Sequence, residues 1–186
     1  MLVTLIAAAR RTPVLDARFG DDRPLDPGDW RALERAIPML LPLAAAELRY
    51  CSPTLSSRQT GDALGLSPLS QLALRECDMG RWHGMTLQEV AGREPEAVDA
   101  WFADPRSAPH GGEPLLAFVS RVGAWLDTRP MANDGRIVAV TESSVIRAAT
   151  LYALKAPPQS YWRTEVRPLS VVNLSGFRGG WSLRLG

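Results

Sequence analysis

The chain has 186 residues, enough for one sizeable hydrophobic core, and its 46% hydrophobic and 22% charged residues are typical of a folded globular domain. A formal net charge of +1 excludes a nucleic-acid or membrane surface that depends on bulk positive charge. Cys51 and Cys77 are too few for a disulfide framework, and no Cys/His cluster suggests a metal site, so we expect free thiols, no metal and no cofactor.

The N-terminal residues 1–11 read as a first core strand rather than a signal peptide, because no positive segment precedes their short apolar run. No run of eighteen apolar residues exists in the sequence, so no membrane span is predicted. We expect a cytoplasmic protein, either a monomer or a homodimer.

Strands and helices alternate in the pattern that follows. Apolar runs predict strands at residues 2–8, 48–52, 70–77 and 136–141, and a closing pair at 169–177 and 180–186. Helical patterns cover residues 30–48, 54–65, 111–129 and 143–156, and we expect Pro38 and Pro42 to kink or split the first of these. Residues 79–112 form a helical excursion with two short helices.

This alternation predicts an α/β fold, a three-layer α/β/α sandwich with a mostly parallel central sheet. Neither a linker nor a repeat interrupts residues 1–186, so we expect a single domain in which the excursion covers a pocket. Four junctions follow candidate strands, at residues 7–10, 52–56, 76–82 and 141–144. Because ligands bind outside the carboxyl ends of strands in such sheets, the four junctions are expected to converge on one pocket.

The stretches "CSPTLSSRQTGDAL", "LRECDMGRWHGMT", "HGGEP" and "IVAVTESSVIRAAT" occur in that order. In this arrangement the chain resembles the histidine phosphatase superfamily, on its phosphoglycerate-mutase-like branch. The resemblance implies a nucleophilic histidine in an Arg-His-Gly triplet after the first strand, a phosphate-clamping arginine in a Ser-Pro-x-x-Arg turn, an acid that protonates the leaving oxygen, and a second histidine in a Thr-His-Gly-Gly turn.

By position, this sequence departs from that pattern at almost every catalytic residue. The triplet's arginine falls on Ala7 and its histidine on Ala8, the clamping arginine on Ser56, and the second histidine on Glu142. Only the acid remains, at Glu76. The resemblance therefore implies a degenerate member that lacks the catalytic histidines.

A methyl group cannot accept a phosphoryl group, and a phosphate needs a cationic cradle. Replacement of two arginines and one neutral histidine by Ala7, Ser56 and Glu142 lowers the formal charge of the pocket by about three units. At an effective dielectric constant of about 20, each unfavourable charge pair at ~4 Å costs about 4 kcal/mol. The free N–H groups at a helix N-terminus stabilise an anion by only about 1 kcal/mol, which does not offset this cost for a bound phosphate. We therefore expect the N-terminus of the helix at 143–156 to interact with the carboxylate of Glu142 instead.

Several candidate residues keep two interpretations. Glu142 either caps the helix or faces a polar or cationic ligand, and Glu76 is either a structural relic or a retained acid/base. If both face one cavity, one carboxyl should have a raised pKa, as in paired acid–base catalysis. Ser143 is more simply a helix-capping residue than a nucleophile, since no histidine base is evident.

The remaining candidates are cations and aromatic residues near the same junctions. Arg10, Arg11, Arg58 and Arg147 either rebuild an anion clamp from new positions or pair with nearby acids. Trp82 is expected to cover the pocket and His83 to line it.

The leading hypothesis is a pseudo-phosphatase, a binding or regulatory protein that holds a small non-phosphorylated ligand or a protein partner. The alternative is an enzyme in which Glu76 and Glu142 perform acid–base chemistry on a neutral or cationic small molecule. A residual phosphatase or mutase is the third possibility, and it lacks a nucleophile.

Overall fold

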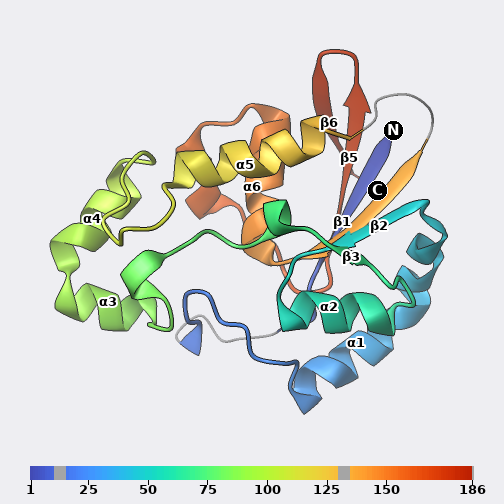
Figure 1. The fold of residues 1–186 in the computed structure, drawn as a ribbon, viewed down its shortest axis with the longest axis horizontal. Coiled ribbons are helices and arrows are strands. Elements are labelled where there is room, and N and C mark those ends of the chain that lie inside the picture. Colours follow the sequence, from blue (N-terminus) through green and yellow to red (C-terminus); the bar gives the residue numbers. More distant parts are fainter. Residues whose placement is uncertain (11–15, 130–134, 186) are drawn as a thin grey trace.

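A mixed six-stranded sheet forms the centre of the computed structural model, which describes residues 1–10, 16–129 and 135–185 (Figure 1). The strands lie in the order β3-β2-β4-β1-β5-β6. They are β1 (Leu2–Ala7), β2 (Leu48–Cys51), β3 (Leu69–Ser70), β4 (Arg136–Thr141), β5 (Val171–Phe177) and β6 (Gly180–Arg184). The first four are mutually parallel, whereas β5 pairs antiparallel with β1 and β6 antiparallel with β5. This confirms the α/β class, the mostly parallel sheet and the closing hairpin.

Helices cover both faces of the sheet (Figure 1). They are α1 (Pro27–Leu40), α2 (Leu55–Ala63), α3 (Leu87–Arg93), α4 (Pro95–Ala103), α5 (Leu115–Asp127) and α6 (Ser143–Leu154), with short 3₁₀ turns at Leu41–Ala45, Leu72–Leu74, Gly80–Trp82 and Pro158–Arg163. One core packs Leu5 and Ala139 of the sheet against α5 and α6. A second core packs Ile6 and Val140 against α1 and α2. Since alternate strand residues enter opposite cores, the three-layer prediction is confirmed.

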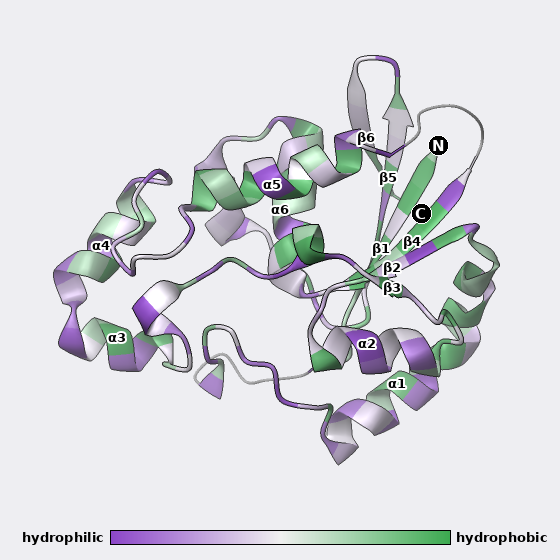
Figure 2. Ribbon diagram, in the orientation of Figure 1, coloured by the Kyte–Doolittle hydropathy of each residue, from purple (hydrophilic) through white to green (hydrophobic). Residues whose placement is uncertain are grey.

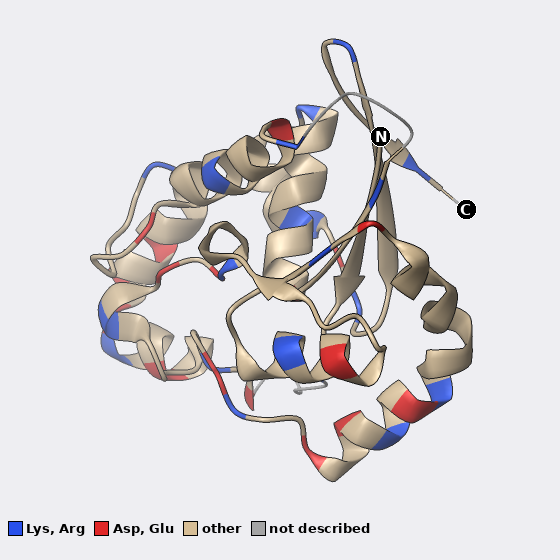
Figure 3. Cartoon of the chain, turned by 45° about the vertical axis from the view of Figure 1, so that its right-hand side comes forward, with Lys and Arg blue, Asp and Glu red and all other residues tan. Residues whose placement is uncertain are grey.

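The distribution of polarity matches this layering. Figure 2 shows hydrophobic central strands, and Figure 3 shows acidic and basic residues interspersed along the helices rather than gathered by sign. None of the helices in the described ranges is long and apolar enough to cross a membrane.

Two predicted elements differ in the structure. The helix predicted at residues 30–48 is α1, which begins after the Asp26 cap, and a 3₁₀ turn from Leu41 to Ala45 that contains Pro42. Pro38 lies inside α1 without ending it.

The strand predicted at residues 70–77 is wrong beyond Ser70. Here β3 pairs with β2 over only two residues before the chain leaves the sheet. The carbonyl groups of Ala73, Arg75 and Glu76 instead accept hydrogen bonds from the Arg121 guanidinium, at 2.9, 3.1 and 3.2 Å. A charged donor from α5 thus replaces the neighbouring strand as the partner of this segment.

Candidate functional site

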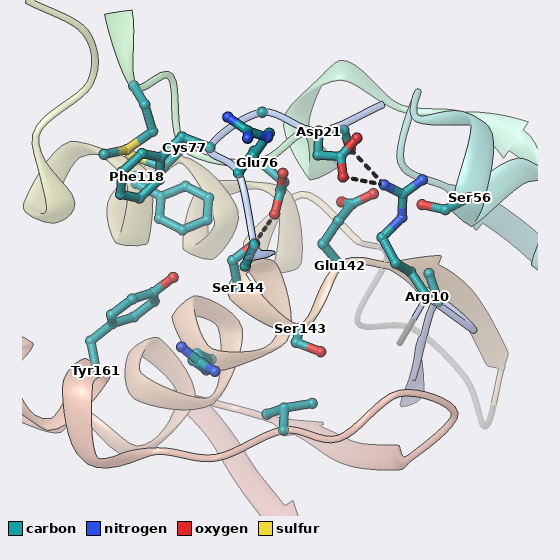
Figure 4. A pocket seen from close by; sticks show the side chains of 18 of the residues that line it. Arg10, Asp21, Ser56, Glu76, Cys77, Phe118, Glu142, Ser143, Ser144 and Tyr161 are labelled. Carbon is teal, nitrogen blue, oxygen red and sulfur yellow. Dashed lines mark hydrogen bonds and ion pairs between the residues drawn. The ribbon is translucent and has the colours of Figure 1, made fainter. Parts of the chain in front are cut away.

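A cavity of about 530 Å³ opens at the carboxyl ends of the strands. All four predicted junctions contribute to it, through Ala8 and Arg10, Ser56, Glu76, and Glu142 with Ser143 (Figure 4). Further parts of the wall come from residues 17–21, Trp101 of α4, the start of α5, and the stretch that contains Tyr161, Trp162 and residues 165–168. The expected convergence of the junctions on one pocket is therefore present in the fold.

Glu142 lies between the N-termini of α6 and α2. Its Oε1 accepts hydrogen bonds from the hydroxyl groups of Thr54 and of Ser57, the latter at 2.8 Å, and its Oε2 accepts one from Thr141 at 3.2 Å. Within the described ranges no side chain caps α6, although Glu142 occupies the N-cap position. The expectation that the N-terminus of α6 satisfies Glu142 is thus wrong, because the carboxylate reaches three hydroxyl groups instead.

Glu76 enters the same cavity from the segment after β3. Its Oε1 accepts a hydrogen bond of 2.8 Å from the Ser144 hydroxyl (Figure 4). Burial raises the pKa of Glu76 to about 7, and the nearby charge of Glu142 adds to this shift. Near neutral pH, therefore, a substantial fraction of Glu76 carries a proton, while Glu142 is engaged by three hydroxyl donors.

Arg121 fixes the position of Glu76 from α5. Besides its three backbone contacts, it forms an ion pair with Glu113 in which Nη2 lies 2.7 Å from Oε2, and both side chains are largely buried. Because Arg121 holds the backbone carbonyl of Glu76 itself, the side chain of Glu76 projects from a rigid segment.

Arg10 is one of four arginines among the described residues of the wall, and it lies beside Ser56 and Glu142 (Figure 4). Its Nη1 lies 2.8 Å from Oδ2 of Asp21, which also pairs with Arg23 at 2.7 Å. Hydrogen bonds from Arg23, and also from Arg10, hold the pKa of Asp21 well below its usual range. The Nε and Nη2 atoms of Arg10 are buried and find no hydrogen-bond partner among the described residues, so the guanidinium is only partly satisfied there.

Aromatic side chains form the opposite part of the wall. Trp101 and Trp162 meet edge to face with ring centroids 4.6 Å apart, and Tyr161 meets Trp162 at 5.0 Å. The guanidinium of Arg147 lies over the ring of Tyr161, 5.7 Å from its centroid. Burial raises the pKa of the Tyr161 hydroxyl, so this residue is a neutral phenol at physiological pH.

Not every candidate residue lies on the cavity wall. Ala7 is fully buried at the end of β1, and Trp82 is fully buried within the excursion, against Phe19, Trp101 and His110. Arg58 and His83 are exposed. None of these four is among the described residues that line the cavity, and Arg11 lies outside the described residues.

Sequence analysis missed several cavity residues because they belong to no recognisable motif. Asp21 and Phe19 come from a loop that crosses from β1 to α1, and Tyr161 and Trp162 come from a 3₁₀ turn after α6. Their spacing from the four junctions follows from loop conformation rather than from periodicity, so only the folded chain brings them together.

Comparisons with known proteins show the family to which the chain belongs. The pattern of the histidine phosphatase superfamily (branch 1) matches residues 17–185. A glucosyl-3-phosphoglycerate phosphatase of Mycolicibacterium vanbaalenii is 33% identical over 109 residues, which are 54% of this chain and 48% of that protein. Phosphoserine phosphatase 1 of Hydrogenobacter thermophilus is 27% identical over 119 residues, 61% of this chain and 56% of that protein. The chain thus spans about half the length of the curated relatives it matches.

Among solved structures, the α-ribazole phosphatase of Shigella flexneri superposes with a TM-score of 0.81 at 21% identity, covering 100% of this chain and 95% of that one. This likeness concerns the fold alone. Because the family pattern extends over nearly all of the sequence, the chain belongs to the histidine phosphatase superfamily.

Proposed function

We propose that this chain has lost phosphohistidine catalysis and acts as a binding protein for a small, non-phosphorylated molecule. The observation that carries the proposal is Ala8, which lines the cavity at the end of β1, where the superfamily places its nucleophile. A methyl group has no lone pair with which to accept phosphorus. The two histidines of the sequence, His83 and His110, are not among the described residues that line the cavity.

Electrostatics supports the same conclusion. A phosphate dianion in the cavity would face the carboxyl groups of Glu142 and Glu76, which line the same wall. At an effective dielectric constant of about 20, each such pair at ~4 Å costs about 4 kcal/mol. Arg10 and Arg147 also line the cavity and offset part of this cost, although Asp21 already pairs with Arg10. An uncharged or weakly anionic ligand avoids most of this penalty.

The direct test is hydrolysis of para-nitrophenyl phosphate, combined with mass spectrometry of the acid-quenched protein. We expect a rate equal to that of buffer and no phosphorylated side chain. As a positive comparison, the variant A7R/A8H/S56R/E142H restores the family's residues, and its control, A7R/A8Q/S56R/E142H, lacks only the nucleophile. Hydrolysis well above buffer, or a phosphorylated residue in the unaltered protein, would refute the proposal.

A second candidate function rests on the raised pKa of Glu76. A carboxyl group that exchanges its proton near pH 7, inside a cavity and beside a second carboxyl, is suited to general acid–base catalysis of proton transfer at carbon. The reaction class would be an isomerisation or elimination of a small molecule.

Deuterium wash-in provides the test of this second function. Small carbonyl compounds and carboxylic acids are incubated with the protein in D₂O and followed by NMR. Exchange should disappear in Glu76→Gln and persist in the surface control Glu47→Gln. If the unaltered protein exchanges no C–H position faster than buffer, the acid–base function is excluded for those compounds.

A further inference from the structure

The cavity has a polar end and an aromatic end. In Figure 4, Arg10, Asp21, Ser56 and Glu142 lie at one end and Phe118 and Tyr161 at the other, with Glu76 and Ser144 between them. A volume of about 530 Å³ falls within the range of small-molecule sites. A ligand that fills such a cavity has an apolar body and a polar head.

We infer that the cavity takes a monocarboxylic acid with a flat, apolar body, whose carboxylate lies at the first turn of α6 beside Ser143 and Arg147 and whose body lies against Phe118 and Trp162. This ligand class rests on the proposed function, since it contains no phosphoryl group.

Unsatisfied hydrogen-bond donors in the cavity wall favour a ligand that accepts hydrogen bonds. Nε of Arg147, and Nε and Nη2 of Arg10, are buried and have no hydrogen-bond partner in the part of the chain that the structure describes, so each of these two guanidinium groups keeps unsatisfied donors. Ser143 and Arg147 both line the cavity and lie one helical turn apart, on the same face of α6. The first N–H groups of α6 receive no side-chain cap, and they add a positive potential at this position.

A cationic ligand is disfavoured by what already covers the aromatic rings. The guanidinium of Arg147 lies 5.7 Å from the centroid of Tyr161, and that of Arg121 lies 5.2 Å from the centroid of Phe118. An organic cation would have to compete with these two cations for the ring faces. Four carboxyl groups of the described residues line the cavity, and each already has a partner: Asp21 and Glu165 pair with arginines, Glu142 accepts three hydroxyl hydrogen bonds, and Glu76 accepts one from Ser144.

A ligand with one negative charge fits the cavity better than a ligand with two. Glu76 and Glu142 line the cavity, and a dianion would meet repulsion from both. A monoanion near Glu76 favours the protonated form of that carboxyl, which can then donate a hydrogen bond to the ligand. The site therefore discriminates by charge number as well as by sign.

The test compares four probes with one phenyl body: 3-phenylpropanoate, 3-phenylpropanamide, 3-phenylpropylamine and phenyl phosphate. Their dissociation constants are measured by isothermal titration calorimetry with the unaltered protein, Arg147→Gln, Arg147→Lys and the exposed control Arg136→Gln. We expect the carboxylate to bind at least tenfold more tightly than each of the other three. Arg147→Gln should weaken its binding about tenfold or more, Arg147→Lys less, and Arg136→Gln not at all. Thermal melting of each variant establishes that it is folded.

Every other result overturns the inference: equal or tighter binding of the amide, the amine or phenyl phosphate, undiminished carboxylate binding in Arg147→Gln, or no binding of the carboxylate at millimolar concentration. If Arg147→Gln does not fold, Arg147→Lys is used for the comparison instead. An unchanged affinity of Arg147→Lys for the carboxylate then also overturns the inference. The carboxylate cannot be hydrolysed, so failure here is distinct from failure of the proposed function, which the phosphatase assay decides separately.

Discussion

Replacement of Glu76 by glutamine should stabilise the protein at alkaline pH and leave its stability nearly unchanged in acid. Glutamine retains an oxygen for the Ser144 hydroxyl, which donates to Glu76 at 2.8 Å, but it carries no charge into the cavity. The substitution therefore removes the cost of an ionised carboxylate that is buried beside Glu142 and preserves the local hydrogen bond.

The sign and size of the effect follow from the pKa. It rises from 4.5 to about 7 on folding, so between these pH values the folded protein binds more protons than the unfolded chain. The free energy of unfolding accordingly falls as the pH increases from 4.5 to about 7. The full shift corresponds to about 3 kcal/mol. Because Glu76 is only partly covered at the cavity wall, solvent reduces this value, and we expect about 1–2 kcal/mol at pH 8.

Urea unfolding followed by tryptophan fluorescence, at intervals from pH 4.5 to 8.5, measures this difference. The free energies of unfolding of the unaltered protein and of Glu76→Gln should agree near pH 4.5 and diverge in favour of the variant up to about pH 7.5. The exposed substitution Glu47→Gln serves as the matched control and should produce no such divergence. A constant difference over the whole pH range would show that Glu76 does not titrate near neutrality in the folded state.

Substitutions at three further residues test the packing of the site and of the contact between α5 and α6. Glu142→Ala leaves the hydroxyl of the buried Ser57 without its acceptor and should lower the free energy of unfolding by about 1–3 kcal/mol, whereas Glu142→Gln, which keeps one acceptor oxygen, should lose less in the same urea titration. Arg121→Gln breaks a largely buried ion pair and frees three backbone carbonyls, so a loss of about 3 kcal/mol is expected; a loss below about 1 kcal/mol would contradict its anchoring role. Gly123→Ala places a methyl group 2.2 Å from the ring of Tyr152, where α5 packs on α6. The substitution should lower the Tm measured by calorimetry by an amount equivalent to about 1–3 kcal/mol. An unchanged Tm would show that the ring of Tyr152 moves aside freely.

The fold was largely predictable because its signals are local or periodic. The apolar run from Arg136 to Thr141 predicts a central strand, and its observed position between β2 and β1 agrees. The same run followed by Ser143 predicts a strand, a turn and a helix, which are β4 and α6. The rule that ligands bind at the carboxyl ends of parallel strands then located the cavity without any knowledge of distances.

The segment after Ser70 shows where local patterns fail. Its apolar residues predict a longer strand, but Arg121, some 46 positions later in the chain, takes the carbonyl groups that a strand would use. A hydrogen bond between backbone carbonyl groups and a side chain so distant in the sequence cannot be predicted from the pattern of about ten neighbouring residues.

Residue identity and order are local properties, so the fold class, the superfamily resemblance and the occurrence of Ala8 and Glu142 at the family's catalytic positions follow from the amino-acid order alone. The surroundings of these residues follow from the folded chain: three hydroxyl groups rather than a helix N-terminus hold Glu142, Glu76 shares its cavity, and Tyr161 and Trp162 form the opposite wall. Hydrogen bonds and pKa values depend on distances of a few ångströms between residues far apart in the chain, and those distances exist only once the two cores have packed.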